Sequence, residues 1–149
     1  MGTEERLAQY LKTVKREKTE RGVGDTRVEA LMSELDLPWR PDGEVWTIAS
    51  DVGEVTLGLS PDDQVLSLWQ AIMPVPPGKP KKHGDLFHEL LMVNAQTQGA
   101  CLAVTEIGTD EWVMVIARLN APTLDKEELA MALGDIFATL KMFDPSDAP

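Results

Sequence analysis

The chain has 149 residues, of which 43% are hydrophobic and 26% are charged, and its formal net charge is −11. This length suits one domain of about 100–200 residues, and the single cysteine, Cys101, excludes an internal disulfide framework and favours a reducing compartment. Residues 1–22 lack the apolar core of a signal peptide, and no stretch reaches the roughly 18 apolar residues of a membrane span, so we expect a cytoplasmic protein.

The charge is divided unevenly along the chain. Residues 1–22 carry six basic and four acidic side chains, a balance of +2, whereas the remainder carries eight basic and 21 acidic side chains, a balance of −13. An acidic body repels nucleic acid and anionic lipid and attracts basic partners. The same charge, common in bacterial proteins, also keeps a protein soluble without naming any partner.

Residues 4–21 are predicted to form a charged amphipathic helix, because apolar residues recur there at helical spacing over about two turns. This apolar stripe consists of Leu7, Tyr10, Leu11 and Val14. Gly22 and Gly24 then interrupt the pattern. Residues 1–24 are therefore assigned to an N-terminal helical extension.

A second helix is predicted to start at Thr26. Thr26 and Glu29 match the S/T-x-x-E capping box, in which each side chain reaches a free backbone amide at the start of a helix. This helix is expected to end before Pro38, because the residue that precedes a proline is pushed out of helical geometry.

Three short β-rich runs follow, at residues 44–50, 54–59 and 65–72. Turn residues separate these runs, and connections this short join antiparallel neighbours, because a parallel return needs about a dozen residues or more. The sequence therefore predicts a three-stranded meander. Residues 73–84, with four prolines and two glycines, are interpreted as an extended connector.

The remaining elements are a helix over residues 85–95, a β-hairpin of residues 100–106 and 111–119, and a last helix that begins at Asp125. The second hairpin strand is apolar on both faces: one row contains Trp112, Met114 and Ile116, and the other contains Val113, Val115 and Ala117. A strand of this kind is buried on both faces, either by the fold or by a second subunit.

This order of elements predicts an α+β domain over residues 25–143, followed by a flexible tail at 144–149. Written as ααβββαββα, it corresponds to a single mainly antiparallel sheet of about five strands with helices packed on one face. The helices are assigned to the face that carries Leu57 and Leu68.

The pattern resembles the YbjN-like family, whose fold is similar to that of type III secretion chaperones. The resemblance is carried by "LLMVNAQTQGACLAV", with a helix-terminal Asn94 and with Gly99 before a strand, and by "LDKEELAMALGDIFATL" in the last helix. It covers roughly residues 25–143 and leaves out the N-terminal extension. The resemblance implies a small dimeric domain that binds segments of other proteins without known catalysis or cofactors.

Cys101 and His88 are the candidates for a catalytic pair, and a small Cys/His-dependent enzyme is the first alternative function. A reactive cysteine needs a base, a cation or a helix N-terminus beside its thiolate, whereas Cys101 follows a helix C-terminus and starts a strand. Free cysteines are commonly buried, so Cys101 is interpreted as structural.

Metal and nucleic-acid sites have weaker support. His83 and His88 are five residues apart and do not share a helix face, and no phosphate loop or dinucleotide fingerprint is present, so we expect no metal and no cofactor. A direct nucleic-acid binder would use the basic connector Lys79–Lys82 with Trp46 or Trp69 as a stacking surface. The acidic body disfavours that second alternative.

Protein binding has the stronger physical basis. Trp69 is expected to project from the face opposite the helices, and a few helices cannot cover both faces of a five-stranded sheet. The alternative is that all four tryptophans belong to the core. We expect the surplus apolar surface to bind a second copy in a homodimer or a segment of a client protein, held in pockets or by strand addition. Such a client would have a basic surface, as a nucleic-acid-handling protein has. The candidate partner or dimer surface consists of Trp46, Trp69, Trp112, Val113 and Val115.

Overall fold

The computed structural model describes residues 23–78 and 80–143, which form one antiparallel sheet of six strands in the order β1-β2-β3-β4-β6-β5. The strands are β1 (Trp39–Asp42), β2 (Val45–Ser50), β3 (Gly53–Leu59), β4 (Val65–Pro74), β5 (Cys101–Ile107) and β6 (Asp110–Asn120). The helices are α2 (Val23–Glu34), α3 (Pro80–Asn94) and α4 (Lys126–Met142), with a short 3-10 turn, η1 (Ala121–Thr123), before α4.

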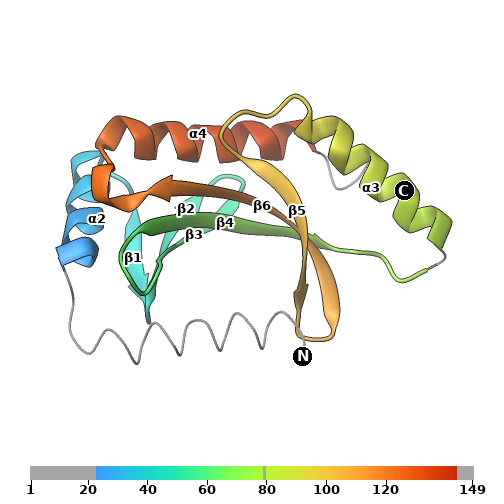
Figure 1. Cartoon of the computed structure of the whole chain (residues 1–149), viewed down its shortest axis with the longest axis horizontal. Coiled ribbons are helices and arrows are strands. Elements are labelled where there is room, and N and C mark those ends of the chain that lie inside the picture. The colour runs from blue at the N-terminus through green and yellow to red at the C-terminus, as the bar shows by residue number, and fades with distance from the viewer. Residues whose placement is uncertain (1–22, 79, 144–149) are drawn as a thin grey trace.

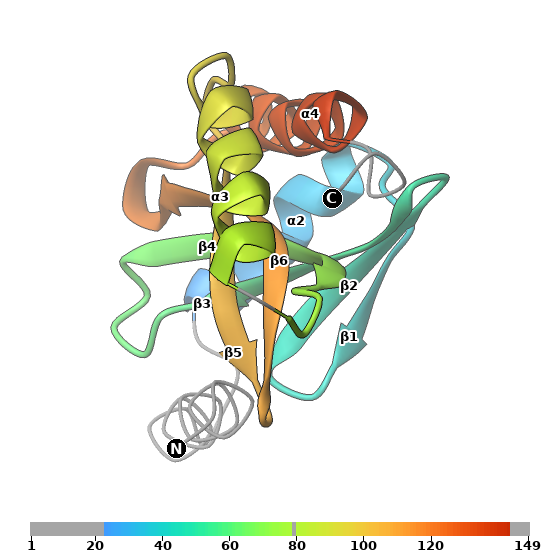
Figure 2. The ribbon, with the colours of Figure 1, turned by 90° about the vertical axis from the view of Figure 1, so that its right-hand side faces the viewer.

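Helices α3 and α4 lie along one side of the sheet, and α2 closes one end of it (Figures 1 and 2). The predicted α+β class, the meander and the second hairpin are therefore confirmed. The predicted helix over residues 4–21 and the predicted tail over residues 144–149 lie outside the described residues.

Strand β1 is the element that the sequence did not predict. Its Pro-Asp-Gly stretch is typical of a turn, but Pro41 pairs with Trp46 on the edge of the sheet, where a missing N–H does not interrupt a ladder. Arg40 fastens this edge: its Nε donates to Thr47 Oγ1 (3.0 Å), and its guanidinium pairs with Glu54 (2.9 Å).

Two predicted boundaries are wrong. Helix α2 is already formed at Val23, so Thr26 lies inside the helix and cannot cap its start. Glu29, the other half of that predicted box, accepts a hydrogen bond from the indole N–H of Trp46 (3.1 Å). The connector at 73–84 is also shorter than expected, because β4 continues to Pro74 and α3 starts at Pro80, a favoured first helical residue.

The start of α4 agrees with its prediction. The carboxylate of Asp125 accepts the backbone N–H of Glu128 (2.8 Å) and so caps the helix. The helix buries its predicted stripe, including Leu129, Leu133 and Ile136, against the sheet. The residue after this helix, Phe143, is fully buried.

The hydrophobic core lies between the sheet and the helices. The face assigned to the helices is confirmed, because its aliphatic side chains are all buried: Val55, Leu57, Leu59, Leu66 and Leu68. Trp46, Val113 and Val115 belong to the same core, with 5%, 0% and 0% of their surface exposed. The structure therefore excludes these three from a partner surface, because their strand positions direct them toward the helices.

The Asn94 side chain joins the end of α3 to the edge strand β5. Its amide nitrogen donates to the carbonyl of Leu102 (2.9 Å), and its oxygen accepts the N–H of Leu102 (2.7 Å). One side chain thus satisfies both backbone groups that Leu102 turns outward from the edge strand. The loop between them needs Gly99, which has a φ of +71° and packs against the Asp135 carboxylate.

Replacing Asn94 by Ala should lower the free energy of unfolding by about 1–3 kcal/mol, because both backbone groups of Leu102 lose their partner in a partly buried place. Asn94→Asp should also destabilise the fold, since its second oxygen repels the Leu102 carbonyl. Urea unfolding followed by tryptophan fluorescence measures both changes. Exposed Gln96 in the same loop supplies the control, Gln96→Ala, which should stay within about 0.5 kcal/mol of wild type. An Asn94→Ala variant as stable as that control would contradict this role.

Candidate binding groove on the open sheet face

The face of the sheet that points away from the helices holds a groove of about 970 Å³. The strand register explains its composition, because Thr56, Trp69, Ile116 and Cys101 are direct neighbours across β3, β4, β6 and β5. These residues alternate with the core residues of the same strands and therefore project to the opposite face. We call this surface the open-face groove.

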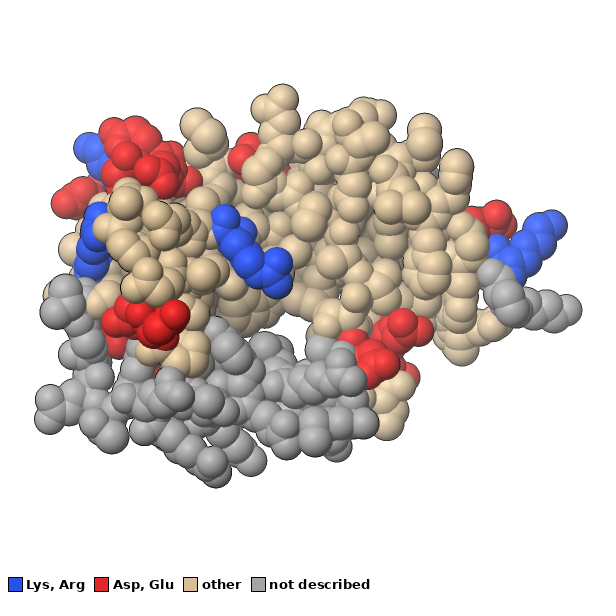
Figure 3. Space-filling view, in the orientation of Figure 1, with Lys and Arg blue, Asp and Glu red and all other residues tan. Residues whose placement is uncertain are grey.

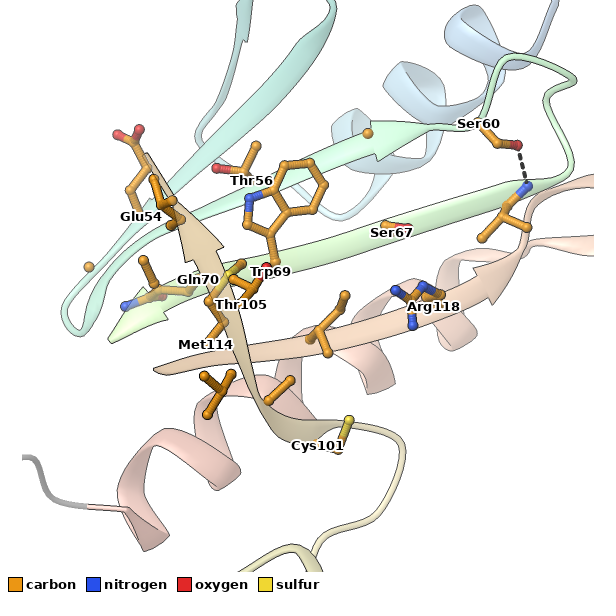
Figure 4. Close-up of a pocket in the computed structure, with 18 residues that line it drawn as sticks. Glu54, Thr56, Ser60, Ser67, Trp69, Gln70, Cys101, Thr105, Met114 and Arg118 are labelled. Atoms are coloured by element: carbon orange, nitrogen blue, oxygen red, sulfur yellow. Dashed lines mark hydrogen bonds between the residues drawn. The ribbon is translucent and has the colours of Figure 1, made fainter. Parts of the chain in front are cut away.

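Trp69 stands on β4 near the middle of the groove, with Thr56 beside it on β3 (Figure 4). Its ring packs over Gly58, where an added Cβ would lie 3.2 Å from the indole, so the missing side chain leaves room for the ring. Met114 lies on the β6 side of the groove and Arg118 lies farther along β6. Trp69 and Ile116 are each only partly buried and so present apolar surface to the groove.

The polar groups of the groove lie mainly at its ends. Arg118 and Ser60 are at one end, and Glu54, which is already paired with Arg40, is toward the other. Gln70 also lines the groove; its Nε2 donates to the Val52 carbonyl (2.6 Å), while its buried Oε1 accepts no hydrogen bond from the described residues.

The turn from β3 to β4 forms a firm rim at one end of the groove. Ser60 Oγ accepts the backbone N–H groups of Gln64 (3.1 Å) and Val65 (3.0 Å), the latter drawn in Figure 4. The Ser60 hydroxyl donates to the Asp62 carboxylate (2.6 Å), and this hydrogen bond, with the N–H of Gln64, lowers the pKa of Asp62. The rim is therefore ordered by local hydrogen bonds rather than by core packing.

Replacing Ser60 by Ala should raise the pKa of Asp62 toward its ordinary value, because the largest cause of the lowering is removed. A carboxyl group whose folded pKa is lowered stabilises the fold above its unfolded pKa, and this stabilisation is lost as the pH falls through the folded pKa. NMR titration of the Asp62 carboxyl carbon measures the shift. Ser67→Ala, a serine in the groove away from that turn, should leave the titration unchanged. An unmoved Asp62 pKa in Ser60→Ala would contradict the assignment.

The groove contains one predicted partner residue in its lining. Trp69 lies in it, whereas Trp112 is half-buried on β6 outside the residues that line it. That Trp69 and Trp112 contact a client or a second copy stays a prediction. Sequence reasoning missed Met114, Ile116 and Arg118 as lining residues, although their alternation with buried neighbours on β6 was a usable signal.

The structure does not assemble the alternative sites. Cys101 is exposed in the groove, contrary to the burial expected of a structural cysteine, while His88 is exposed on α3 and does not line the groove. His83 instead shares a hydrogen bond with the Pro76 carbonyl (2.8 Å). Across residues 23–78 and 80–143, no group of three or more His, Cys, Asp or Glu side chains is placed to hold a metal ion.

The basic connector is likewise separate from the tryptophans. Lys81 lies in the first turn of α3 and does not line the groove, and Lys79 lies outside the described residues.

Figure 3 shows that acidic side chains gather over the start of α4, where Glu127 and Glu128 lie, while wide areas of this side carry no charge. No helix in the described part of the chain is long and apolar enough to cross a bilayer.

Comparison with solved structures shows that the fold is YbjN-like. The chain is similar to YbjN from E. coli, a protein put forward as a transcription regulator, with a TM-score of 0.60, 13% identity, and coverage of 82% of this chain and 87% of that one. It is also similar to an uncharacterized protein from Methanothermobacter thermautotrophicus, with a TM-score of 0.57, 12% identity, and coverage of 80% and 94%. Neither description names an enzyme. No protein-family model and no curated protein matches the sequence.

Proposed function

We propose that this YbjN-like fold is a non-enzymatic, chaperone- or adaptor-like module that holds a segment of a client protein in the open-face groove. The observation that carries the proposal is the groove itself, with Trp69 and Ile116 partly exposed in a hollow of about 970 Å³. A hollow of this size accepts several side chains. Tryptophan is a frequent anchor of binding energy in protein interfaces.

The face of the sheet suits a bound segment better than its edges do. Strand addition needs a run of free backbone groups along an edge. On β5 the Asn94 amide already occupies both groups of Leu102, and on β1 Pro41 has no N–H to offer. The groove, by contrast, offers apolar surface between the polar groups at its ends.

The acidic body favours a basic client. With a balance of −13 outside residues 1–22, the protein attracts positively charged partners over distances of about a Debye length, roughly 8 Å at physiological salt. Proteins that handle DNA or RNA carry such surfaces, so a client of that class fits the charge. The description of E. coli YbjN as a transcription regulator is compatible with such a client.

Replacing Trp69 by Ala, or Ile116 by Lys, should weaken client binding about 30-fold, because an interface anchor contributes on the order of 2 kcal/mol or more. The client is first captured from the native cell and identified by mass spectrometry, and its purified form is then titrated calorimetrically. Leu91→Lys is the matched control, because Leu91 is a highly exposed apolar residue on α3 outside the groove lining. Equal affinity of all variants and wild type would exclude the groove as the client site.

The proposal includes a homodimer, as the resemblance implies. A stable interface removes about 1,600 Å² of surface in total, which requires an extended apolar face rather than single exposed residues. Light scattering at micromolar concentration should therefore report twice the 16.4 kDa chain mass. A dimer that Ile116→Lys dissociates uses the groove, whereas one that survives the change leaves the groove free for a client. A strict monomer would contradict this part of the proposal.

A further inference from the structure

We infer that residues 4–21 of the chain itself are an intramolecular occupant of the open-face groove, which a client has to displace. That a client has to displace this segment, the regulatory half of the inference, rests on the proposed function. That the segment docks in the groove, the docking half, does not. Four observations carry it: the place where the chain enters α2, the length of the segment, its apolar stripe, and its charge.

The chain enters α2 at one end of the groove. Gly24, in the first turn of α2, packs so closely against the Asp63 side chain that an added Cβ would lie 2.8 Å from its carboxylate. Asp63 belongs to the β3–β4 turn, whose residues Ser60 and Val65 line the groove. In Figures 1 and 2 the first turn of α2, in deep blue, is the end of that helix nearer the open face. Arg21 is therefore three residues in sequence from Gly24, which lies at the groove rim.

The segment has the length that the groove requires. An 18-residue helix is about 27 Å long, and the seven residues of β3 span about 23 Å. Val14 precedes Arg21, the end of the predicted helix, by seven residues, about 11 Å of helix, and Trp69 lies four residues along β4 from Val65, about 13 Å. A helix that runs from the rim back along the strands thus brings Val14 near Trp69, and the rest of its apolar stripe extends toward the far end of the groove.

The chemistry of the segment complements the groove. Its stripe of Leu7, Tyr10, Leu11 and Val14 supplies apolar side chains to the partly exposed Trp69. Residues 1–22 have a balance of +2, and the rest of the chain has a balance of −13, so the two parts attract each other. The segment therefore has the properties expected of the client, in the same molecule.

A tethered occupant competes strongly because its effective concentration is in the millimolar range for a short linker. The apparent affinity of a client equals its affinity for an open groove multiplied by the fraction of molecules whose groove is open. If the segment occupies the groove about nine-tenths of the time, a client binds about tenfold more weakly than to an open groove. Only clients that contact the groove better than residues 4–21 are then retained.

Docking is tested with the full chain by placing a nitroxide on Cys101, the only cysteine, which is exposed in the groove. In the nitrogen-15-labelled protein, the nitroxide should broaden the backbone amide signals of residues 7–14 relative to the same sample with the label reduced. Leu7→Glu with Leu11→Glu should abolish this broadening. Gln9→Glu with Thr13→Glu adds the same charge on the opposite side of the predicted helix and should preserve it.

Three results would overturn the docking. One is the absence of broadening in the wild-type chain; another is equal broadening in both double variants. The third is broadening that persists when a nitrogen-15-labelled Cys101→Ser chain is mixed with unlabelled spin-labelled chain, because the occupant is then a second copy. A nitroxide at Leu91→Cys in the Cys101→Ser background, on α3, controls for contacts outside the groove.

The regulatory half is tested by calorimetry with the purified client. Leu7→Glu with Leu11→Glu should raise client affinity about tenfold, and Gln9→Glu with Thr13→Glu should leave it unchanged. Docking without a change in client affinity would overturn the regulation alone. If Trp69→Ala leaves client affinity unchanged while the broadening is present, the proposed function fails and the docking stands.

Discussion

The architecture depends on the two-residue period of the strands. Every second side chain points to the same face, so three described helices can cover only one face of a six-stranded sheet. Leu57 and Leu68 are consequently sealed in the core, while their neighbours Thr56 and Trp69 face the other way. The groove lies on that uncovered side and is lined mainly by residues of β3, β4, β5 and β6.

The open face is useful only if the sheet beneath it keeps its shape. The two ends of the strand order are fixed by polar contacts: Arg40 ties β1 to Thr47 and Glu54, and Asn94 ties α3 to β5. Of these side chains only Glu54 lines the groove, at one of its ends. The geometry of the groove is therefore maintained without committing its own apolar residues to the core.

The sequence predicted the elements better than their ends. Alternation and helical spacing identified the meander, the hairpin and α4, because their signals extend over many residues. Strand β1 was missed since the Pro41-Asp-Gly stretch is typical of turns, and only its partner β2 makes an edge strand of it. For the groove, sequence alone placed Trp69 on the correct face. It put Val113 and Val115 in the partner surface, because a strand that is apolar on both sides does not reveal which side the helices cover.

The modified edges also limit how molecules can assemble. A sheet that exposes apolar surface is at risk of growing edge to edge into fibrils, because each added strand offers a new edge. Here Pro41 interrupts one margin, and the amide of Asn94 fills part of the other. Both features disfavour growth through the edges, so the proposed association uses the broad side of the sheet, where one client segment or one second copy completes the contact. For the proposed function we therefore expect closed complexes with one occupant per chain.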